Sequence, residues 1–430
     1  MEKVIVIFGP NGSGKTQYVE SLRRQLASDR VRYLAFSDAY GPATDKAYYL
    51  QLRWNQHDID EETPCVGQLL DKVYQQSGAD TPEHRQLQAH LYQLFGMSEL
   101  LDKYVILLSS GELRKFQLIK TLLANPSILI LDNPFIGLDA EARQQLNELF
   151  QMLVSKHDIT LYLVISKKGD IPEYADKIIP MGEQTADEIP LTTDLSTLTP
   201  PSAPIPSDSE VVIDMHKVSI RYGERTILRD LDWQVRQGER WALSGQNGSG
   251  KSTLLSLVCA DNPQSYACDI ALFGNQRGSG ESIWEIKRRI GYVSPEMHRS
   301  YLRDLPTINV VASGLKDTVG LYVRPNEPEK ALCRRWLKLF GIDHLADRSF
   351  ITLSSGEQRL ALVARAFVKN PELLILDEPL HGLDDHNREL VRTIMNRYCE
   401  QPHKTLIMVT HYEEELPSCI NRHIYLKRQI

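Results

Sequence analysis

The sequence is short of cysteine and has no excess of positive charge. Its 430 residues include six cysteines, and no two of them form a Cys-x-x-Cys pair. Scattered single thiols are typical of buried, reduced side chains rather than of disulfides or metal sites. The formal net charge is -7, which disfavours nucleic acid as a partner, because proteins that follow a phosphate backbone carry basic patches.

Long apolar runs are missing as well. No stretch reaches the roughly 18 apolar residues that a membrane-spanning helix needs. The N-terminus, MEKVIVIFGPNGSGK, lacks the basic segment and long apolar core of a signal peptide. We therefore expect a cytoplasmic protein, in which any role at the inner face of a membrane depends on a partner. The length predicts two or three domains.

What the chain does contain is an internal repeat. The octapeptide GPNGSGKT at residues 9–16 recurs as GQNGSGKS at 245–252, and LSSGE at 108–112 recurs at 353–357. The two LSSGE copies and the two aspartates that end later apolar runs share one separation, 245 positions (108 to 353 and 132 to 377). Two motifs with one separation indicate a duplicated domain rather than a solenoid.

The repeat predicts a first domain at residues 1–181, a linker at 182–210 and a second domain at 211–430. The linker is rich in Pro, Ser and Thr, so we interpret it as a partly extended connection, with an ordered surface arm as the alternative. In each copy strands alternate with helices, which predicts an α/β fold with a mostly parallel sheet and a helical segment. The first copy has only residues 1–8 before its glycine loop, whereas the second has further strand-like stretches at 211–244, so we expect an additional antiparallel sheet in the second copy alone.

Both octapeptides match G-x-x-x-x-G-K-[ST], the phosphate loop. Its glycines let backbone N–H groups surround phosphate oxygens, and the following helix adds a partial positive charge. Lys15 and Lys251 are expected to reach the β- and γ-phosphates of a nucleotide, and Thr16 and Ser252 are expected to bind Mg²⁺. The other predicted nucleotide-binding residues of the loops are Gly9, Asn11, Gly12, Ser13, Gly14, Gly245, Asn247, Gly248, Ser249, Gly250 and Thr253.

The aspartates that end the apolar runs, Asp132 and Asp377, are expected to supply a further carboxylate for the magnesium ion. Glu378 follows Asp377 and can take a proton from the water that attacks the γ-phosphate, a role typically worth about 10²–10⁴ in rate. In the first copy Asn133 stands at this place. An amide can hydrogen-bond water but cannot accept its proton. Asn also suits a turn before Pro134, and both explanations can hold.

The pentapeptide LSSGE has two interpretations. Ser-x-x-Glu before an apolar helical run is a capping box, in which the serine and the glutamate satisfy the first backbone N–H groups of a helix. A capped helix end that exposes Ser and Gly is also an anion site. Its recurrence shortly before each strand-ending aspartate favours the functional role.

The order of phosphate loop, LSSGE, LILD and GLD resembles the ATP-binding cassette (ABC) ATPases, and the resemblance covers nearly the whole chain twice. It implies ATP as substrate, Mg²⁺ as cofactor, and a signature pentapeptide of one cassette that closes over the nucleotide of the other. Ser354 and Gly356 would then face ATP on the first phosphate loop. Ser109 and Gly111 would face ATP on the second.

The resemblance also assigns the loops around the nucleotide. Asp139 and Asp384 match the D-loop aspartate, and Tyr222 matches the aromatic residue that stacks on adenine. The switch histidine matches His411, whereas the first copy has Ser166 there. The first copy has no equivalent of the stacking aromatic. It thus lacks the glutamate, the histidine and the aromatic together, which predicts one hydrolytic and one degenerate site.

The Q-loop departs from the family pattern. In IGYVSPEMH, Pro295 occupies the glutamine position with Glu296 beside it, and in the first copy Gln51 is the best candidate. Within the family, GYVSPEMH and NVVASGLKDTVGLY resemble the ModF-like tandem ATPases, described as molybdate-transport or photorepair-type ATP-binding proteins. This implies membrane permease subunits as partners.

Two other functions stay open from the sequence. One is a soluble ATP-dependent switch acting on another protein, a ribosome or nucleic acid. The other is a non-enzymatic ATP-sensing module. The linker has a root-mean-square span of roughly 30 Å, which favours pairing of the two copies within one chain, and pairing in a homodimer is the alternative.

Overall fold

The structure is a computed structural model, and it forms two compact units, Met1–Gln184 and Thr185–Ile430. The residues that the structure describes are 2–26, 30–35, 63–78, 80–108, 110–135, 138, 140–182, 194–200, 209–223, 225–246, 248–295, 297, 301, 304–318, 324–410 and 412–428.

The first unit is built on a five-stranded parallel sheet with the strand order β2-β3-β4-β1-β5. Its strands are β1 (Val4–Phe8), β2 (Val31–Ala35), β3 (Ile128–Asp132), β4 (Thr160–Ile165) and β5 (Lys177–Pro180). The central strands are runs of Val, Ile and Leu that are buried on both faces, as strands of a parallel sheet usually are.

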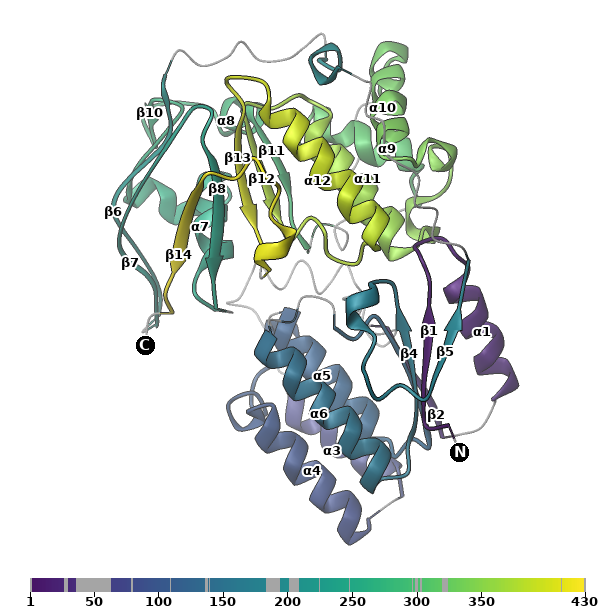
Figure 1. Ribbon diagram of the computed structural model, residues 1–430. Helices are drawn as coiled ribbons and strands as arrows, with labels where there is room; N and C mark the ends of the chain where they lie inside the picture. The colour runs from purple at the N-terminus through teal and green to yellow at the C-terminus, as the bar shows by residue number, and fades with distance from the viewer. Residues whose placement is uncertain are drawn as a thin grey trace. The chain divides into compact units, whose positions relative to one another are not determined.

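Helices cover the two faces of this sheet unequally (Figure 1). The helices are α1 (Lys15–Gln25), α3 (Val66–Gln76), α4 (Pro82–Leu94), α5 (Ser110–Leu123) and α6 (Ala140–Lys156). Side chains of α3 to α6 pack in one large cluster with Val4 and Val6 of β1. The opposite face, with Ile7, packs in a small cluster with Val19 of α1.

The second unit repeats the same sheet with the order β11-β12-β13-β8-β14. Its strands are β8 (Arg240–Gly245), β11 (Ile290–Val293), β12 (Leu373–Asp377), β13 (Thr405–Val409) and β14 (Arg422–Leu426). Each strand has a counterpart at the same place in the first unit. The duplicated sequence therefore folds into a duplicated topology.

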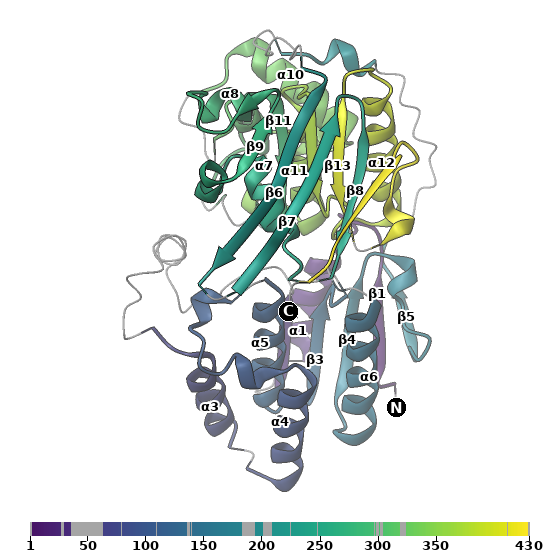
Figure 2. The same cartoon turned by 90° about the vertical axis from the view of Figure 1, so that its left-hand side faces the viewer.

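A four-stranded antiparallel sheet, in the order β10-β9-β6-β7, completes the second unit. It consists of β6 (Val211–Tyr222), β7 (Arg225–Arg236), β9 (Asp269–Leu272) and β10 (Asn275–Gln276). Figure 2 shows the long strands β6 and β7 in front of the parallel sheet. Their apolar side chains share one core with the helix that follows the phosphate loop. The described residues of the first unit form no such sheet.

The helices of the second unit are α7 (Lys251–Val258), α8 (Ile283–Arg289), α9 (Thr307–Ala312), α10 (Glu327–Leu339), α11 (Ser355–Phe367) and α12 (Asp385–Cys399). The last four pack together and against β12 and β13 in the largest apolar cluster of the unit. The fold class expected from the sequence is confirmed: two mostly parallel α/β cores, each with helices, and an antiparallel sheet in the second.

Part of the stretch between the two copies packs on the second unit. Leu195 and Leu198 are buried in the same apolar cluster as α10 and α11. The Thr197 hydroxyl accepts a hydrogen bond from Arg335 at 2.9 Å, and the Thr199 hydroxyl accepts one from Asn370 at 2.7 Å. Residues 194–200 are therefore an ordered segment of the second unit. The boundaries 1–181, 182–210 and 211–430 stay predictions.

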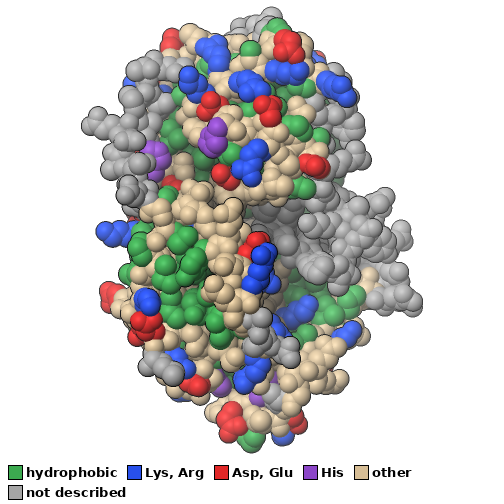
Figure 3. All heavy atoms as spheres, turned by 90° about the vertical axis from the view of Figure 1, so that its right-hand side faces the viewer, with side chains coloured by type: hydrophobic (Ala, Val, Ile, Leu, Met, Phe, Trp, Pro, Cys, Tyr) green, Lys and Arg blue, Asp and Glu red, His purple; other side chains and the backbone are tan. Residues whose placement is uncertain are grey.

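Apolar side chains also gather at the surface of the first unit, on the side that Figure 3 shows. Ile178, on the edge strand β5, is 49% exposed.

Among the described residues, none of the helices combines the length and apolar character needed to cross a membrane.

Candidate nucleotide site

Each phosphate loop lies between a strand of the parallel sheet and the helix that follows it. β1 leads to α1, which begins at Lys15, and β8 leads to α7, which begins at Lys251. The residue before each helix is a glycine in the left-handed region, Gly14 with φ 84° and Gly250 with φ 95°. Glycine adopts this conformation without a Cβ clash, so the sequence places the start of each helix.

The two loop lysines fold back over their own loops. The Lys15 ammonium donates hydrogen bonds to the carbonyls of Gly9 and Pro10, each at 2.5 Å. The Lys251 ammonium donates to the carbonyls of Gly245 at 2.6 Å and Gln246 at 3.2 Å. In both copies the charge therefore lies directly over the backbone that is expected to surround phosphate.

Buried loop hydroxyls support an anion at both places. Ser13 Oγ and Ser249 Oγ are buried and have no hydrogen-bond partner among the residues that the structure describes. A buried polar atom without a partner is costly, and a phosphate oxygen would accept from each hydroxyl. Together with the lysines, these loops fit a nucleoside triphosphate. Thr16 and Ser252 lie in the first turn of their helices. Asn11, Gly12, Gly248 and Thr253 also lie in the described loops and helix starts, whereas Asn247 lies outside the described residues.

Among the described residues, a strand of the antiparallel sheet packs against the second phosphate loop and none packs in this way against the first. A Cβ added at Gly250 would lie 2.9 Å from Ile227 Cγ2 and 3.0 Å from Leu228 Cδ2, on β7. A Cβ added at Gly14 would approach no atom closer than Gln17 Oε1, at 3.9 Å. The antiparallel sheet therefore reaches the second phosphate loop.

The predicted adenine-stacking residue lies at the end of this sheet. Tyr222 is the last residue of β6, and its side chain is 52% exposed. Its hydroxyl accepts a hydrogen bond from Asn262 Nδ2 at 3.0 Å, which holds the ring in place. An exposed, anchored ring is suited to stack on a base.

In the first unit, both carboxylate oxygens of Asp132 accept hydrogen bonds. Tyr33 donates its hydroxyl to Oδ2 at 3.1 Å, and Asn133 donates its amide to Oδ1 at 2.9 Å. Burial raises the pKa of the Asp132 carboxyl, and the hydrogen bond from Tyr33 and the charge of Lys15 oppose that rise. Burial, and then the charge of Asp132, raise the pKa of Tyr33. No sequence motif indicated Tyr33, because its contact with Asp132 depends on the pairing of β2 with β3.

The residues after the two strand-ending aspartates share one unusual backbone conformation. Asn133 has φ 50° and Glu378 has φ 49°, both left-handed. Asn is among the few residues that adopt this region readily, whereas Glu is not. Asn133 therefore suits its turn, as one sequence interpretation held, while Glu378 occupies the same turn under strain. Asp377, before Glu378, is buried at the end of β12.

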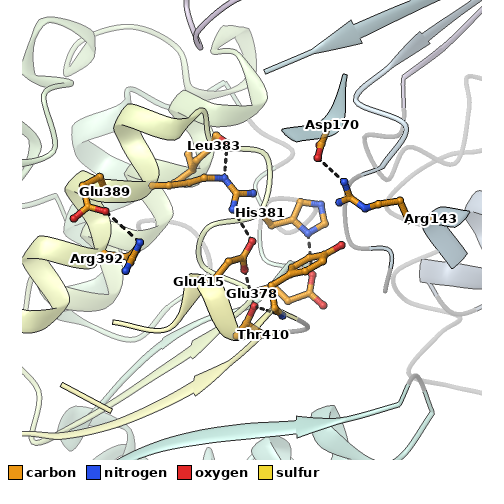
Figure 4. A network of polar contacts seen from close by, with 11 residues as sticks. Arg143, Asp170, Glu378, His381, Leu383, Glu389, Arg392, Thr410 and Glu415 are labelled. Carbon is orange, nitrogen blue, oxygen red and sulfur yellow. Dashed lines mark hydrogen bonds and ion pairs between the residues drawn. The ribbon is translucent and has the colours of Figure 1, made fainter. Parts of the chain in front are cut away.

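Glu378 has a partner that the sequence reasoning did not single out. His381 Nδ1 lies 2.9 Å from Glu378 Oε2 (Figure 4). The side chains of His381 and Glu378 are 12% and 19% exposed. In the same turn, the His381 amide donates to the Glu378 carbonyl at 3.2 Å.

The second signature pentapeptide forms the capping box that its spacing allows. Ser354 donates its backbone N–H to Glu357 Oε2 at 2.8 Å, and the Glu357 amide donates to Ser354 Oγ at 3.4 Å. Gly356 is buried in the first turn of α11. In the first copy Gly111 is exposed on α5, and Ser109 lies outside the described residues. A capped helix start is compatible with both interpretations.

In the second unit, an ion pair joins α12 to the segment that follows β13. Arg388 donates from Nε to the Leu383 carbonyl at 2.9 Å and from Nη1 to Glu415 Oε1 at 2.5 Å. Thr410, directly before the predicted switch residue, donates to Glu415 Oε2 at 2.6 Å. Asp384 caps α12 by accepting from the Asn387 amide at 2.8 Å. Figure 4 shows the contacts of Leu383, Glu415 and Thr410.

The first unit has the same ion pair. Arg143 Nη1 lies 2.5 Å from Asp170 Oδ1, and these two residues precede Arg388 and Glu415 by the same 245 positions that separate the other repeated motifs. That separation could have revealed the pair from the sequence. Ser166, in contrast, is buried, and its hydroxyl has no hydrogen-bond partner among the described residues.

Four further predicted residues lie outside the described residues: Gln51, Asp139, Glu296 and His411. Pro295 follows the end of β11. The preceding Ser294 carbonyl accepts a hydrogen bond from Arg359 of α11 at 3.0 Å. Helix α11 is thus tied directly to the segment that follows β11, which contains the predicted Q-loop position.

The ABC transporter family model matches residues 1–136 and 228–381. The ABC transporter ATP-binding protein ModF of Escherichia coli is 37% identical, over 97% of this chain and 89% of that protein. An uncharacterized ABC transporter ATP-binding protein of Schizosaccharomyces pombe is 30% identical, over 98% of this chain and 91% of that protein.

Among solved structures, a model of ribosome-bound archaeal Pelota and ABCE1 is similar with a TM-score of 0.63, over 99% of this chain and 72% of that chain. At 18% identity this likeness shows the fold alone. The family match and the two full-length relatives confirm the resemblance found in the sequence. The chain is therefore a tandem ATP-binding protein of the ABC transporter family, and it is an ATPase.

Proposed function

We propose that the two cassettes form unequal sites, one that hydrolyses ATP and one that holds it. The observation that carries this proposal is the shared turn of Glu378 and Asn133, with φ 49° and φ 50°. A left-handed residue other than Gly or Asn costs about 1–2 kcal/mol. Strain of this kind clusters at functional sites, which supports a chemical role for Glu378. Asn133 avoids the strain and cannot accept a proton.

At the hydrolytic site, Lys251 neutralises charge on the β- and γ-phosphates and fixes the nucleotide over the loop. Glu378 orients the attacking water and accepts its proton as the bond from water oxygen to γ-phosphorus forms and the β–γ bridge breaks. ADP and phosphate are the products. Ser252 and Asp377 offer the oxygen donors that Mg²⁺ prefers, and the ion, when bound, stabilises negative charge on the phosphates.

At the holding site, Lys15 and the Ser13 hydroxyl bind phosphate in the same way. The residues that would act on water are replaced. Asn133 commits its amide to Asp132, and Ser166 is a buried hydroxyl in place of a histidine. Thr16 and Asp132 offer donors for Mg²⁺, although the carboxylate already accepts two hydrogen bonds.

Each site is completed by the signature of the other cassette in this proposal. Ser109 and Gly111 complete the hydrolytic site, and Ser354 and Gly356 complete the holding site. His411 serves as the switch residue, Asp139 and Asp384 as D-loop residues, and Gln51 as the Q-loop residue of the first cassette. The two cassettes of one chain pair with each other, and a homodimer is the alternative arrangement.

Two single variants test the asymmetry. Glu378→Gln is expected to lower steady-state ATPase turnover by roughly 10²-fold or more while ATP still binds. Lys15→Ala is expected to remove one of two bound nucleotides and to keep measurable turnover. Thermal unfolding of both proteins serves as the folding control. If Glu378→Gln retains near-full turnover, the proposal is wrong.

We also propose that the protein serves a membrane transporter through separate permease subunits, supported by the similarity to the ABC transporter ATP-binding protein ModF. The resemblance points to a molybdate-type importer. Pro295 at the Q-loop position weakens this link, because that loop normally contacts the permease. Affinity capture from the native cell, with and without ATP, tests it. Recovery of a permease supports the proposal, and recovery of ribosomal or nucleic-acid material contradicts it.

A further inference from the structure

The proposed base Glu378 contacts His381, a residue that can donate a hydrogen bond as well as occupy a turn. His381 Nδ1 is 2.9 Å from Glu378 Oε2, and both side chains are largely buried. The tautomer with a proton on Nδ1 donates a hydrogen bond to Oε2 of this carboxylate. A glutamate side chain rotates about three bonds, and this hydrogen bond restricts that rotation.

The duplicated sequence provides its own comparison. The position 245 residues before His381 is Ile136, just as Asn133 precedes Glu378 by 245. The copy without the glutamate therefore also lacks the histidine. The ion pairs Arg143–Asp170 and Arg388–Glu415 are, in contrast, present in both copies. A side-chain contact that serves only to build these loops is expected in both copies of the repeat.

We propose that His381 is a positioning residue for hydrolysis, which holds the Glu378 carboxylate by a hydrogen bond from Nδ1. This inference rests on the proposed role of Glu378 as the base. His381 acts through Glu378 and does not touch the nucleotide. Its contribution lies in the turnover step and not in ATP binding.

The physical reason lies in the geometry of proton transfer. A base acts only when its oxygen lies within hydrogen-bond reach of the water, at about 2.6–3.2 Å. The backbone of Glu378 is strained, with φ 49°. We therefore expect the direction of its side chain to depend on the contacts that its carboxylate makes. Misplacement of a reacting group by about 1 Å can cost roughly 10²-fold in rate.

Three substitutions at this position separate positioning from turn building. His381→Ile installs the residue of the first copy and removes the donor. His381→Asn places an amide nitrogen close to the position of Nδ1, whereas His381→Gln places it further out, near that of Nε2. His386→Asn, at an exposed position on α12, is the matched control.

The measurements are kcat and KM for ATP in the full chain, with thermal unfolding alongside. His381→Ile and His381→Gln are expected to lower kcat roughly 10- to 100-fold with KM unchanged. His381→Asn is expected to stay within about threefold of the native chain, as is the control. The inference is overturned if Asn and Gln variants lose kcat equally, if KM changes instead of kcat, or if His381→Ile leaves kcat unchanged. Should the Ile variant not fold, the comparison of Asn with Gln decides.

The double variant Glu378→Gln/His381→Ile separates this inference from the proposed function. If His381 acts through Glu378, the double variant has the turnover of Glu378→Gln alone. A further loss in the double variant contradicts positioning through Glu378. If Glu378→Gln by itself keeps turnover, the proposed function fails. If Glu378→Gln abolishes turnover while His381→Ile does not lower it, only the present inference fails.

Discussion

Tyr33 donates a hydrogen bond from its hydroxyl to Oδ2 of Asp132, at 3.1 Å, across adjacent strands of the first sheet. The Asn133 side-chain amide donates a hydrogen bond to the other carboxylate oxygen of Asp132, Oδ1, at 2.9 Å. The carboxylate at the end of β3 is thus held by the protein itself on both sides. Under the proposed function, this is the carboxylate of the holding site.

Removal of the Tyr33 hydroxyl should make the first unit more sensitive to pH. Burial raises the pKa of Asp132, so stability tied to this group is present at low pH and is lost as pH rises through its folded pKa. The hydrogen bond from Tyr33 favours the charged form and opposes that loss. Tyr33→Phe is expected to cost about 1–3 kcal/mol of unfolding free energy at neutral pH and less in acid.

Denaturant unfolding at about pH 7 and about pH 4 measures this difference. Tyr162→Phe is the control, because Tyr162 lies near the same small cluster on β4. The expectation would be contradicted if Tyr33→Phe lost equal free energy of unfolding at the two pH values, or lost no more than the control variant.

Restoring the glutamate alone should not restore hydrolysis in the first cassette. Asn133→Glu places a poorly suited residue at φ 50°, removes the amide that bonds Asp132, and sets two carboxylates side by side. We expect a loss of about 1–3 kcal/mol in stability and no gain in turnover, since Ser166 replaces the histidine. Turnover is measured in a Glu378→Gln background, where a clear rise would count against the expectation.

The ion pair between Arg388 and Glu415 should contribute far more to the free energy of unfolding than an exposed ion pair does. Their side chains are 16% and 9% exposed, so Arg388→Met leaves a buried carboxylate without its cation and should cost about 3–5 kcal/mol. Arg334, paired with Asp347 at 53% and 77% exposure, is the control, and Arg334→Met should cost about 0–1 kcal/mol. Similar melting temperatures of the two variants would refute this difference.

The two glycines that precede the phosphate-loop helices should differ in tolerance. Gly14→Ala and Gly250→Ala each put a Cβ at positive φ, which costs about 1–2 kcal/mol. At Gly250 the Cβ also lies 2.9 Å from Ile227, and such overpacking costs about 1–3 kcal/mol more. Thermal unfolding should therefore show a larger loss of stability for Gly250→Ala than for Gly14→Ala. The reverse order would show that β7 can shift to accommodate the added Cβ at little cost.

Much of the fold was predictable, because the relevant signals are local or repeated. The strand runs VIVIF and LLILD, the glycine loops and the common separation of 245 positions together indicate two parallel α/β cores. The antiparallel sheet of the second unit follows from the strand-like stretches before its glycine loop. The ordered segment 194–200 was only an alternative in the sequence, since two leucines among Pro, Ser and Thr do not show which surface they bury against.

The candidate site divides in the same way. The sequence by itself determined the residues whose chemistry stands in contiguous motifs, the loop lysines, the strand-ending aspartates and the exchange of Glu378 for Asn133. Only the tertiary structure decided which side chains meet them: Tyr33 on Asp132, His381 on Glu378, and Arg388 on Glu415. The left-handed backbone shared by Asn133 and Glu378 was equally hidden. A motif fixes chemistry at one point in the chain, whereas hydrogen bonds between strands and across turns depend on register and backbone angles, which arise only when the sheet and its helices pack.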